Sequence, residues 1–309
     1  MKRSFFSFIC LGLLLFGPCD LIGALEIGII GGINNMTFHP DRITAHGKSI
    51  EFKQFQNYPF GFGDFYLKSD ISGFTGFNFN VSRDNILRNR ASAIVTTYSD
   101  YFNVEFGPFV GINDNFDKPD IGIMGGIDIF YPGIVFLSLK GSSSLGVLHE
   151  VFGKNASETA EAKIGLWLSN MIPSFSVSTK NYTNYLEDSS IIRDELLRFQ
   201  GSADFFAKNF PATVRFDAAY EVITRSYLRY NNEVIDELKA LFVGTEIKWQ
   251  ITKPISIIAG FEIPIYIIGA ASRERTGPSE FKPIPDPMKD PDGIFNLYKF
   301  HGGIAFTFF

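Results

Sequence analysis

Long apolar runs are almost absent from this sequence after its first two dozen residues. The most apolar later stretch, Ile255 to Ala271, carries Glu262 and Pro264 and alternates with a period of two. Because a spanning helix needs about 20 consecutive apolar residues, the sequence argues against a helical bundle in the inner membrane. Cysteine is scarce too, since Cys10 and Cys19 are the only two.

The first 24 residues have the pattern of a secretory signal peptide. Lys2 and Arg3 precede an apolar run from Phe5 to Phe16, and the small residue Ala24 follows. The run is about 12 residues long, too short to span a bilayer as a helix. We expect cleavage after Ala24, which leaves residues 25–309 as one exported domain without a thiol for disulfide chemistry.

An alternative export signal centres on Cys19. This cysteine ends the apolar run, where a lipoprotein signal would place its acylated residue. Pro18 argues against lipidation, because such signals have Gly, Ala or Ser before the cysteine. The sequence therefore favours cleavage at Ala24 over lipidation of Cys19.

The net charge of the chain is −5. Removal of residues 1–24, which include Lys2, Arg3 and Asp20, makes it more negative. Nucleic-acid binding relies on an excess of basic residues that neutralise phosphates, so this balance argues against a nucleic acid as partner.

Motifs for catalysis, metal binding or cofactor binding are not found. His39, His46, His149 and His301 lack metal-ligand spacing on one element, and Ser142 to Ser144 lack the spacing of a nucleophile elbow. We therefore expect no enzyme activity, no metal and no cofactor.

Short alternating segments dominate the rest of the chain. Residues 102–113, 214–222 and 241–249 each place mostly apolar side chains at every second position and mostly polar or small ones between them, with Phe109 and Phe242 as apolar exceptions on the polar faces. Successive side chains of a strand point to opposite faces, so each segment has one apolar and one polar face. The sequence predicts an all-β fold.

The connections between these segments alternate between longer and very short ones, as in transmembrane barrels. Counting back from Phe309 gives an up-and-down antiparallel β-barrel of about 14 strands, if one strand lies at Lys48 to Gln56. The connection Asn57 to Leu67 is then unusually long, so 12 strands remain an alternative.

The C-terminal strand carries the one motif-like resemblance. Tyr298, Phe300, Ile304, Phe306 and Phe308 precede a terminal Phe309, although Phe309 is out of phase with the apolar face. This strand resembles the closing strand of Gram-negative outer-membrane barrels of the porin-like superfamily. The resemblance implies location in the bacterial outer membrane, contact with its lipid, and recognition of the strand ending at Phe309 by the barrel-assembly machinery.

Charged residues at polar-face positions are expected to line the lumen, because an Arg or Lys facing lipid near mid-bilayer costs roughly 2–4 kcal/mol. They are Glu105, Lys140, Glu161, Lys163, Arg198, Asp204, Arg215, Asp217, Glu221, Glu246, Lys248 and Glu262. Charges of both signs fit either an aqueous path or a lumen plugged by ion pairs. About 14 strands favour the path, because they leave more room than an eight-stranded barrel that side chains fill. Asp204 and Arg215 are expected to oppose each other on adjacent strands.

Three functions remain open. The first is a passive channel for small hydrophilic solutes. The second is a surface-exposed adhesion or structural barrel acting through the loops Leu145 to Asn155, Ser226 to Glu237 and Ala270 to Asp292. The third is transport of hydrophobic compounds, as in fatty-acid transport barrels.

Aromatic residues near the strand ends favour two interfacial belts. The residues assigned to the belts are Trp167, Trp249, Tyr98, Tyr131, Tyr182, Tyr185, Tyr227 and Tyr230.

Overall fold

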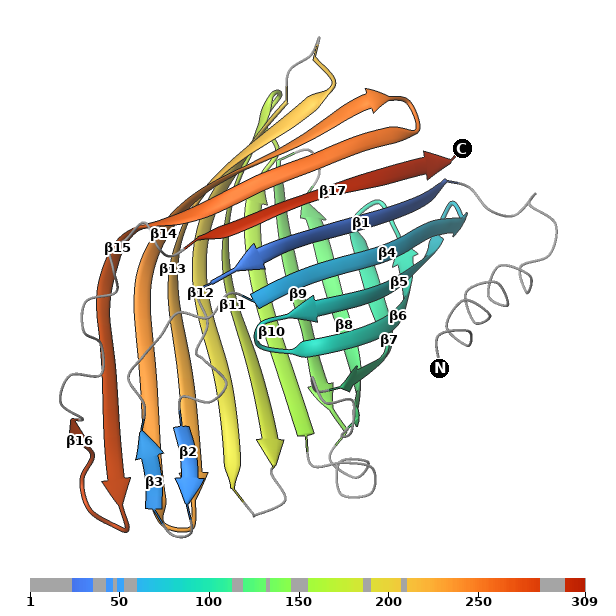
Figure 1. Cartoon of the computed structure of the whole chain (residues 1–309). Helices are drawn as coiled ribbons and strands as arrows, with labels where there is room; N and C mark the ends of the chain where they lie inside the picture. Colours follow the sequence, from blue (N-terminus) through green and yellow to red (C-terminus); the bar gives the residue numbers. More distant parts are fainter. Residues whose placement is uncertain are drawn as a thin grey trace.

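The computed structural model shows a barrel of antiparallel strands (Figure 1). The structure describes residues 24–35, 43–46, 49–52, 60–112, 119–131, 134–145, 155–185, 190–206, 210–283 and 298–308. The predicted signal segment apart from Ala24, with both cysteines, and the terminal Phe309 lie outside these residues. Within them, no helix has the length and apolarity needed to cross a membrane.

Within the described residues, the barrel wall consists of fourteen strands. They are β1 (Leu25–Asn34), β4 (Phe60–Ser72), β5 (Thr75–Asp84), β6 (Arg88–Tyr98), β7 (Phe102–Ile112), β8 (Pro119–Tyr131), β9 (Val135–Ser144), β10 (Asn155–Leu166), β11 (Met171–Tyr185), β12 (Ile191–Phe206), β13 (Ala212–Arg229), β14 (Asn232–Thr252), β15 (Ile255–Thr276) and β17 (Lys299–Phe308). Outside the wall, β2 (Ile43–His46) pairs with β3 (Ser49–Phe52), and β16 (Lys282–Pro283) pairs with β15.

The barrel closes where the first and last strands meet. Leu25 of β1 pairs with Phe308 of β17 on one side and with Ser69 of β4 on the other. β17 in turn pairs with β15, which pairs with β14. The predicted fold class, an up-and-down antiparallel barrel, and the predicted count of 14 strands are confirmed.

One strand of the prediction is wrong. The predicted strand at Lys48 to Gln56 is not in the wall; its described part belongs to β3, and residues 48 and 53–56 lie outside the described part of the chain. The predicted connection Asn57 to Leu67 instead contributes most of β4. The alternation of Phe62, Asp64 and Tyr66 against Gly61, Gly63 and Phe65 was hidden by glycine, which gives no polar or apolar signal of its own.

Alternation separates an outer apolar face from an inner polar face. On β13, Phe216 is 54% exposed whereas Glu221 is 1% exposed. The neighbouring strands follow the same pattern, with Ile247 and Trp249 exposed on β14 and Phe242 buried. The predicted faces of the segments 102–113, 214–222 and 241–249 are confirmed.

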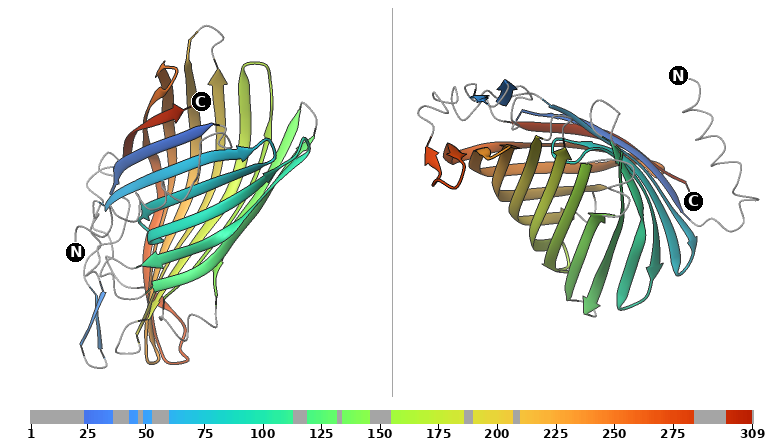
Figure 2. Two further views of the ribbon diagram at one scale, coloured as in Figure 1. Left: turned by 90° about the vertical axis from the view of Figure 1, so that its right-hand side faces the viewer. Right: turned by 90° about the horizontal axis from the view of Figure 1, so that it is seen from below.

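The two ends of the barrel differ in their connections. At the end where β17 reaches Phe308, here called the turn end, all connections between successive strands are short. At the opposite end, here called the loop end, β11 to β15 run past the shorter strands β1 and β4 to β9 (Figures 1 and 2). The predicted loop Ser226 to Glu237 is therefore wrong: Arg229 pairs with Asn232, and a tight turn joins β13 to β14.

The predicted loop Ala270 to Asp292 is also partly strand, because β15 continues to Thr276. Residues 284–297 of that segment and residues 146–154 of the third predicted loop lie outside the described part. In both segments, polar residues at the strand ends suggested loops. These polar residues belong to strands because the sheet extends beyond its apolar band.

Inner glycines make room for aromatic side chains that lie along the wall. A Cβ on Gly28 would lie 2.2 Å from the Tyr66 ring, and a Cβ on Gly122 would lie 2.3 Å from the Phe109 ring. Gly76 receives the Tyr98 side chain in the same way. Packing of an aromatic residue over a cross-strand glycine covers the backbone that the glycine leaves bare.

The aromatic belts are therefore only partly as predicted. Trp249, Tyr131 and Tyr230 are exposed. Tyr98 points inward over Gly76, Tyr182 and Tyr227 are buried, and Trp167 packs against the rings of Phe130 and Phe136. Position near a strand end did not reveal which face each ring occupies.

Candidate functional site: the barrel interior

The strand alternation places all twelve charged residues expected in the lumen on the inner face. Side chains from strands that are not neighbours can meet only on the concave side of the wall. Lys140 of β9 donates a hydrogen bond of 3.0 Å to Glu105 of β7 across Gly126 of β8. Glu161 lies beside Lys140 in the register of β10 and β9, and Lys163 lies one inner position closer to the turn end.

Asp204 and Arg215 form the pair that the sequence predicts. They are directly opposite in the register of β12 and β13. Arg215 Nε lies 2.6 Å from Asp204 Oδ1, and Nη2 lies 3.1 Å from Oδ2, so the contact is bidentate. The side chain of Arg215 is 38% exposed, which keeps this pair in contact with water.

A second group of charges meets deeper in the interior, from four strands. Arg198 of β12 bonds to Glu221 of β13 and lies 3.0 Å from Glu262 of β15. Lys299 of β17 lies 2.7 Å from the same Glu221 and 3.3 Å from Glu262. Asp217 lies 3.8 Å from Arg198 without a hydrogen bond to it. Two cations and three carboxylates thus share one small volume.

Two further contacts extend this charged region toward the turn end. His301 Nε2 lies 2.9 Å from Glu246 Oε2, beside Gly260, where a Cβ would collide with the imidazole. Lys248 Nζ lies 3.9 Å from Glu26 of β1. His301 and Glu26 were not predicted as lumen residues; both occupy inward positions of their strands, which is the signal that could have found them.

We call the following set the interior belt: Arg198, Asp204, Arg215, Asp217, Glu221, Glu246, Glu262, Lys299 and His301. Its carboxylates outnumber its Arg and Lys residues. The buried atoms Asp217 Oδ2 and Glu221 Oε2 have no hydrogen-bond partner among the described residues, and both are acceptors. The belt therefore has more capacity for a cation or a hydrogen-bond donor than for an anion.

The opposite wall, β6 to β10, carries a polar group that was not predicted from the sequence. Arg90 donates to Ser142 at 3.0 Å and to Ser157 at 2.6 Å, and its guanidinium lies over the Phe109 ring. Asp120 accepts hydrogen bonds from Ser144 and Ser157. Both charges are buried and satisfied, so they hold four strands together inside.

Two ion pairs cross the lumen at the loop end. Lys180 of β11 bonds to Asp84 of β5, and Arg88 of β6 lies 2.9 Å from Asp194 of β12. In each case five wall strands separate the partners on one side and seven on the other, so the partners come from nearly opposite walls. Arg225 of β13 also binds Asp194, at 2.6 Å.

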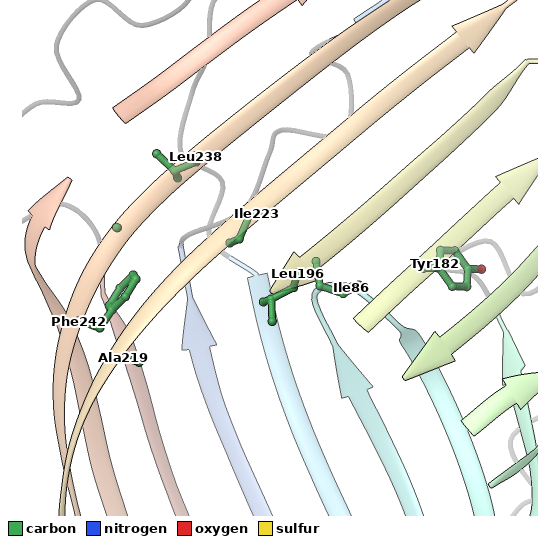
Figure 3. Packing of buried hydrophobic residues seen from close by; sticks show 8 residues of the cluster. Ile86, Tyr182, Leu196, Ala219, Ile223, Leu238 and Phe242 are labelled. Carbon is green, nitrogen blue, oxygen red and sulfur yellow. The ribbon is translucent and has the colours of Figure 1, made fainter. Parts of the chain in front are cut away.

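An apolar contact accompanies these ion pairs. Ile86, at the tip of the β5–β6 turn, lies beside Leu196 of β12, with Ile223 and Leu238 on the next strands (Figure 3). All four side chains are buried. The strand count favoured an aqueous path over a plugged lumen, whereas the structure brings opposite walls together here. Polarity alone did not show that the turn folds inward.

Exposure of the inner charges varies along the barrel. The side chain of Lys248 is 47% exposed and that of Lys140 is 41% exposed, against 5% for Asp194. Inner charges nearer the turn end are therefore open to water, whereas at the loop end Asp194 is buried and the Asp84–Lys180 pair is partly exposed.

The described residues contain no group of His, Cys, Asp and Glu arranged to hold a metal ion. His39 and His149 lie outside those residues, and His301 instead bonds to Glu246.

Comparison with known proteins gives structural similarity without sequence similarity. The sequence matches no protein-family model and no curated protein. An outer-membrane channel from Pseudomonas putida F1 is similar over 95% of this chain and 100% of that chain, with 7% identity and a TM-score of 0.44. A bacterial polysaccharide outer-membrane secretin covers 92% of this chain and 97% of its own, with 10% identity and a TM-score of 0.44.

OmpT, an outer-membrane protein of Vibrio cholerae, covers 94% of this chain and 99% of its own, with 6% identity and a TM-score of 0.40. The solved structures that this barrel resembles are outer-membrane β-barrel proteins.

Proposed function

We propose that the chain is a bacterial outer-membrane barrel that forms a channel for small hydrophilic solutes, with a preference for cations. The turn end would face the periplasm and the loop end the exterior, as is usual for barrels with short periplasmic turns.

The outer face supports insertion in a membrane. On β13 the apolar outward residues run from Val214 to Val222, and Thr224 and Ser226 continue the face as polar residues. Nine residues at about 3.3 Å each, tilted by about 40°, give a band of roughly 20–25 Å, close to the thickness such barrels require. On β14 the outward residues change from apolar to polar at the same level, at Lys239, which pairs with Val222.

The interior belt is the observation that carries the channel proposal. A barrel with a purely structural interior needs its charges balanced, because each unpaired buried carboxylate is destabilising. Here the carboxylates exceed the bases, and Asp217 Oδ2 has no donor within the described part of the chain. Such an excess in a narrow interior attracts cations and repels anions.

A second candidate, a surface-exposed structural or adhesion barrel, is favoured by one specific observation. The ion pairs Asp84–Lys180 and Arg88–Asp194 join opposite walls, as expected for a barrel that is permanently plugged. The extension of β11 to β15 would then present the binding surface.

Conductance across planar bilayers distinguishes the two functions. Folded protein, identified by a mobility in unheated detergent gels that changes on boiling, is added to one side in potassium chloride. Discrete current steps that disappear with the boiled sample support the channel. Sealed bilayers with fully folded protein would favour the surface barrel.

A further inference from the structure

We propose that the β5–β6 turn, residues Asp84–Arg88, is the gate of this channel, and that the structure shows it closed. This inference rests on the proposed channel function. The turn leaves one wall and reaches the opposite wall, so its displacement would open the loop end without any change in the strand pairing of the barrel.

The gate is held by contacts of two kinds. Asp84 and Arg88, at the two ends of the turn, bond to Lys180 and Asp194 on the far wall. Between them Ile86 inserts among apolar side chains of β12 to β14 (Figure 3). The ion pairs fix the position of the turn against the far wall, and the apolar packing excludes water from the contact.

The Asp84 side chain links the shape of the turn to its attachment. Its Oδ1 accepts hydrogen bonds from the backbone N–H groups of Ile86 at 2.7 Å and of Leu87 at 3.0 Å. Its Oδ2 binds Lys180. One carboxylate therefore fixes the turn conformation with one oxygen and docks the turn with the other.

Arg88 occupies a backbone conformation that suits glycine better. Its φ is 62°, in the left-handed region, at the end of a three-residue hairpin connection. Backbone strain of this kind persists where other contacts of the residue compensate for it. Here the Arg88 side chain binds Asp194 on the far wall. Tyr230, with a φ of 53° in the β13–β14 turn, has the same backbone state and is 66% exposed.

The attachment points differ in their access to water. The side chains of Lys180 and Asp84 are 35% and 24% exposed, whereas Asp194 is buried. The Asp84–Lys180 pair is therefore screened by solvent and is the weaker of the two. Opening of the gate would begin at this pair.

Single-channel recording of the exported protein tests the gate through two substitutions with matched controls. Lys180→Glu puts two like charges together and should raise the ratio of open to closed time about tenfold, whereas Lys180→Arg should retain the wild-type ratio. Arg88→Gly relaxes the backbone but removes the bond to Asp194, and should also raise the ratio. Tyr230→Gly makes the same backbone change at a turn that does not cross the lumen and should have no effect.

A cross-link gives the complementary result. In the variant Ile86→Cys/Leu196→Cys, a short reducible bis-maleimide should abolish conductance, and reduction should restore it. The native cysteines, Cys10 and Cys19, lie in the predicted signal segment. A cross-linked barrel that conducts as well as the reduced one would overturn the gate and leave the channel standing. Absence of conductance in every folded variant, including Lys180→Glu, would overturn the channel and the gate with it.

Discussion

Asp204 and Arg215 face each other across β12 and β13 and share a bidentate contact that remains open to water. Their place in the register follows from the position of the short turn between the strands. Because solvent screens the pair, we expect a coupling free energy of at most about 1 kcal/mol. A double-mutant cycle of Asp204→Asn and Arg215→Gln, followed by urea unfolding in lipid vesicles, measures it. A coupling several times larger would show that the lumen is dry at this level.

Asp194 should matter far more to stability than the neighbouring surface charge. It is buried and binds both Arg225 and Arg88. Asp194→Asn leaves cations buried without their counter-ion and should lower the free energy of unfolding by about 3 kcal/mol. The control Arg193→Gln removes a charge that is half-exposed on the outer face of the same strand, and should cost at most about 0.5 kcal/mol. Equal effects of the two substitutions would contradict this account of the interior.

The glycines of the inner face should be sensitive to any side chain, and those of the outer face should not. A Cβ on Gly28 would overlap the Tyr66 ring, whereas a Cβ on Gly61 meets no atom within 4 Å. Gly28→Val should therefore destabilise the barrel by about 1–3 kcal/mol through overpacking. Gly61→Val should be neutral or slightly stabilising, since valine favours strands. Urea unfolding of both variants in the same lipid vesicles measures the two changes in the free energy of unfolding.

The mature chain is predicted to begin at Leu25, the first residue of β1. Leu25 pairs with Phe308, so cleavage after Ala24 would leave the closing strand pair intact. Intact-mass measurement of protein from the membrane fraction should give the mass of residues 25–309. A diacylated N-terminal Cys19 would show the lipoprotein signal instead.

Much of the fold could be predicted because a barrel with an apolar outer face and a polar inner face leaves a direct record in its sequence. Alternation along 214–222 and 241–249 identified which face of each strand is apolar, and turn spacing identified the direction of each strand. β4 was missed because its outward positions include Gly61 and Gly63, which carry no hydropathy signal. The ends of β13 and β15 were misjudged because the wall continues beyond the apolar band, where the outward positions become polar.

The interior could be predicted only in part. The sequence identified the inward charges and the pair Asp204–Arg215, because neighbouring strands have a countable register. It did not reveal that Lys180 would meet Asp84 or that Lys299 would meet Glu221, since contacts across the lumen depend on the curvature of the wall. Nothing in the sequence around Ile86 and Arg88 indicated that the turn points inward.

The most direct test of the central claim, an ion path lined by the interior belt, is the reversal potential in a potassium chloride gradient for wild type and Arg215→Glu. Wild type should prefer cations, because carboxylates exceed bases in the belt. Arg215→Glu should fold normally and shift the reversal potential further toward the cation limit, because it replaces a water-accessible positive charge with a negative one. If wild type, Arg215→Glu and the gate variant Lys180→Glu all fold normally and none of them conducts, the channel account is contradicted and the surface-barrel function takes its place.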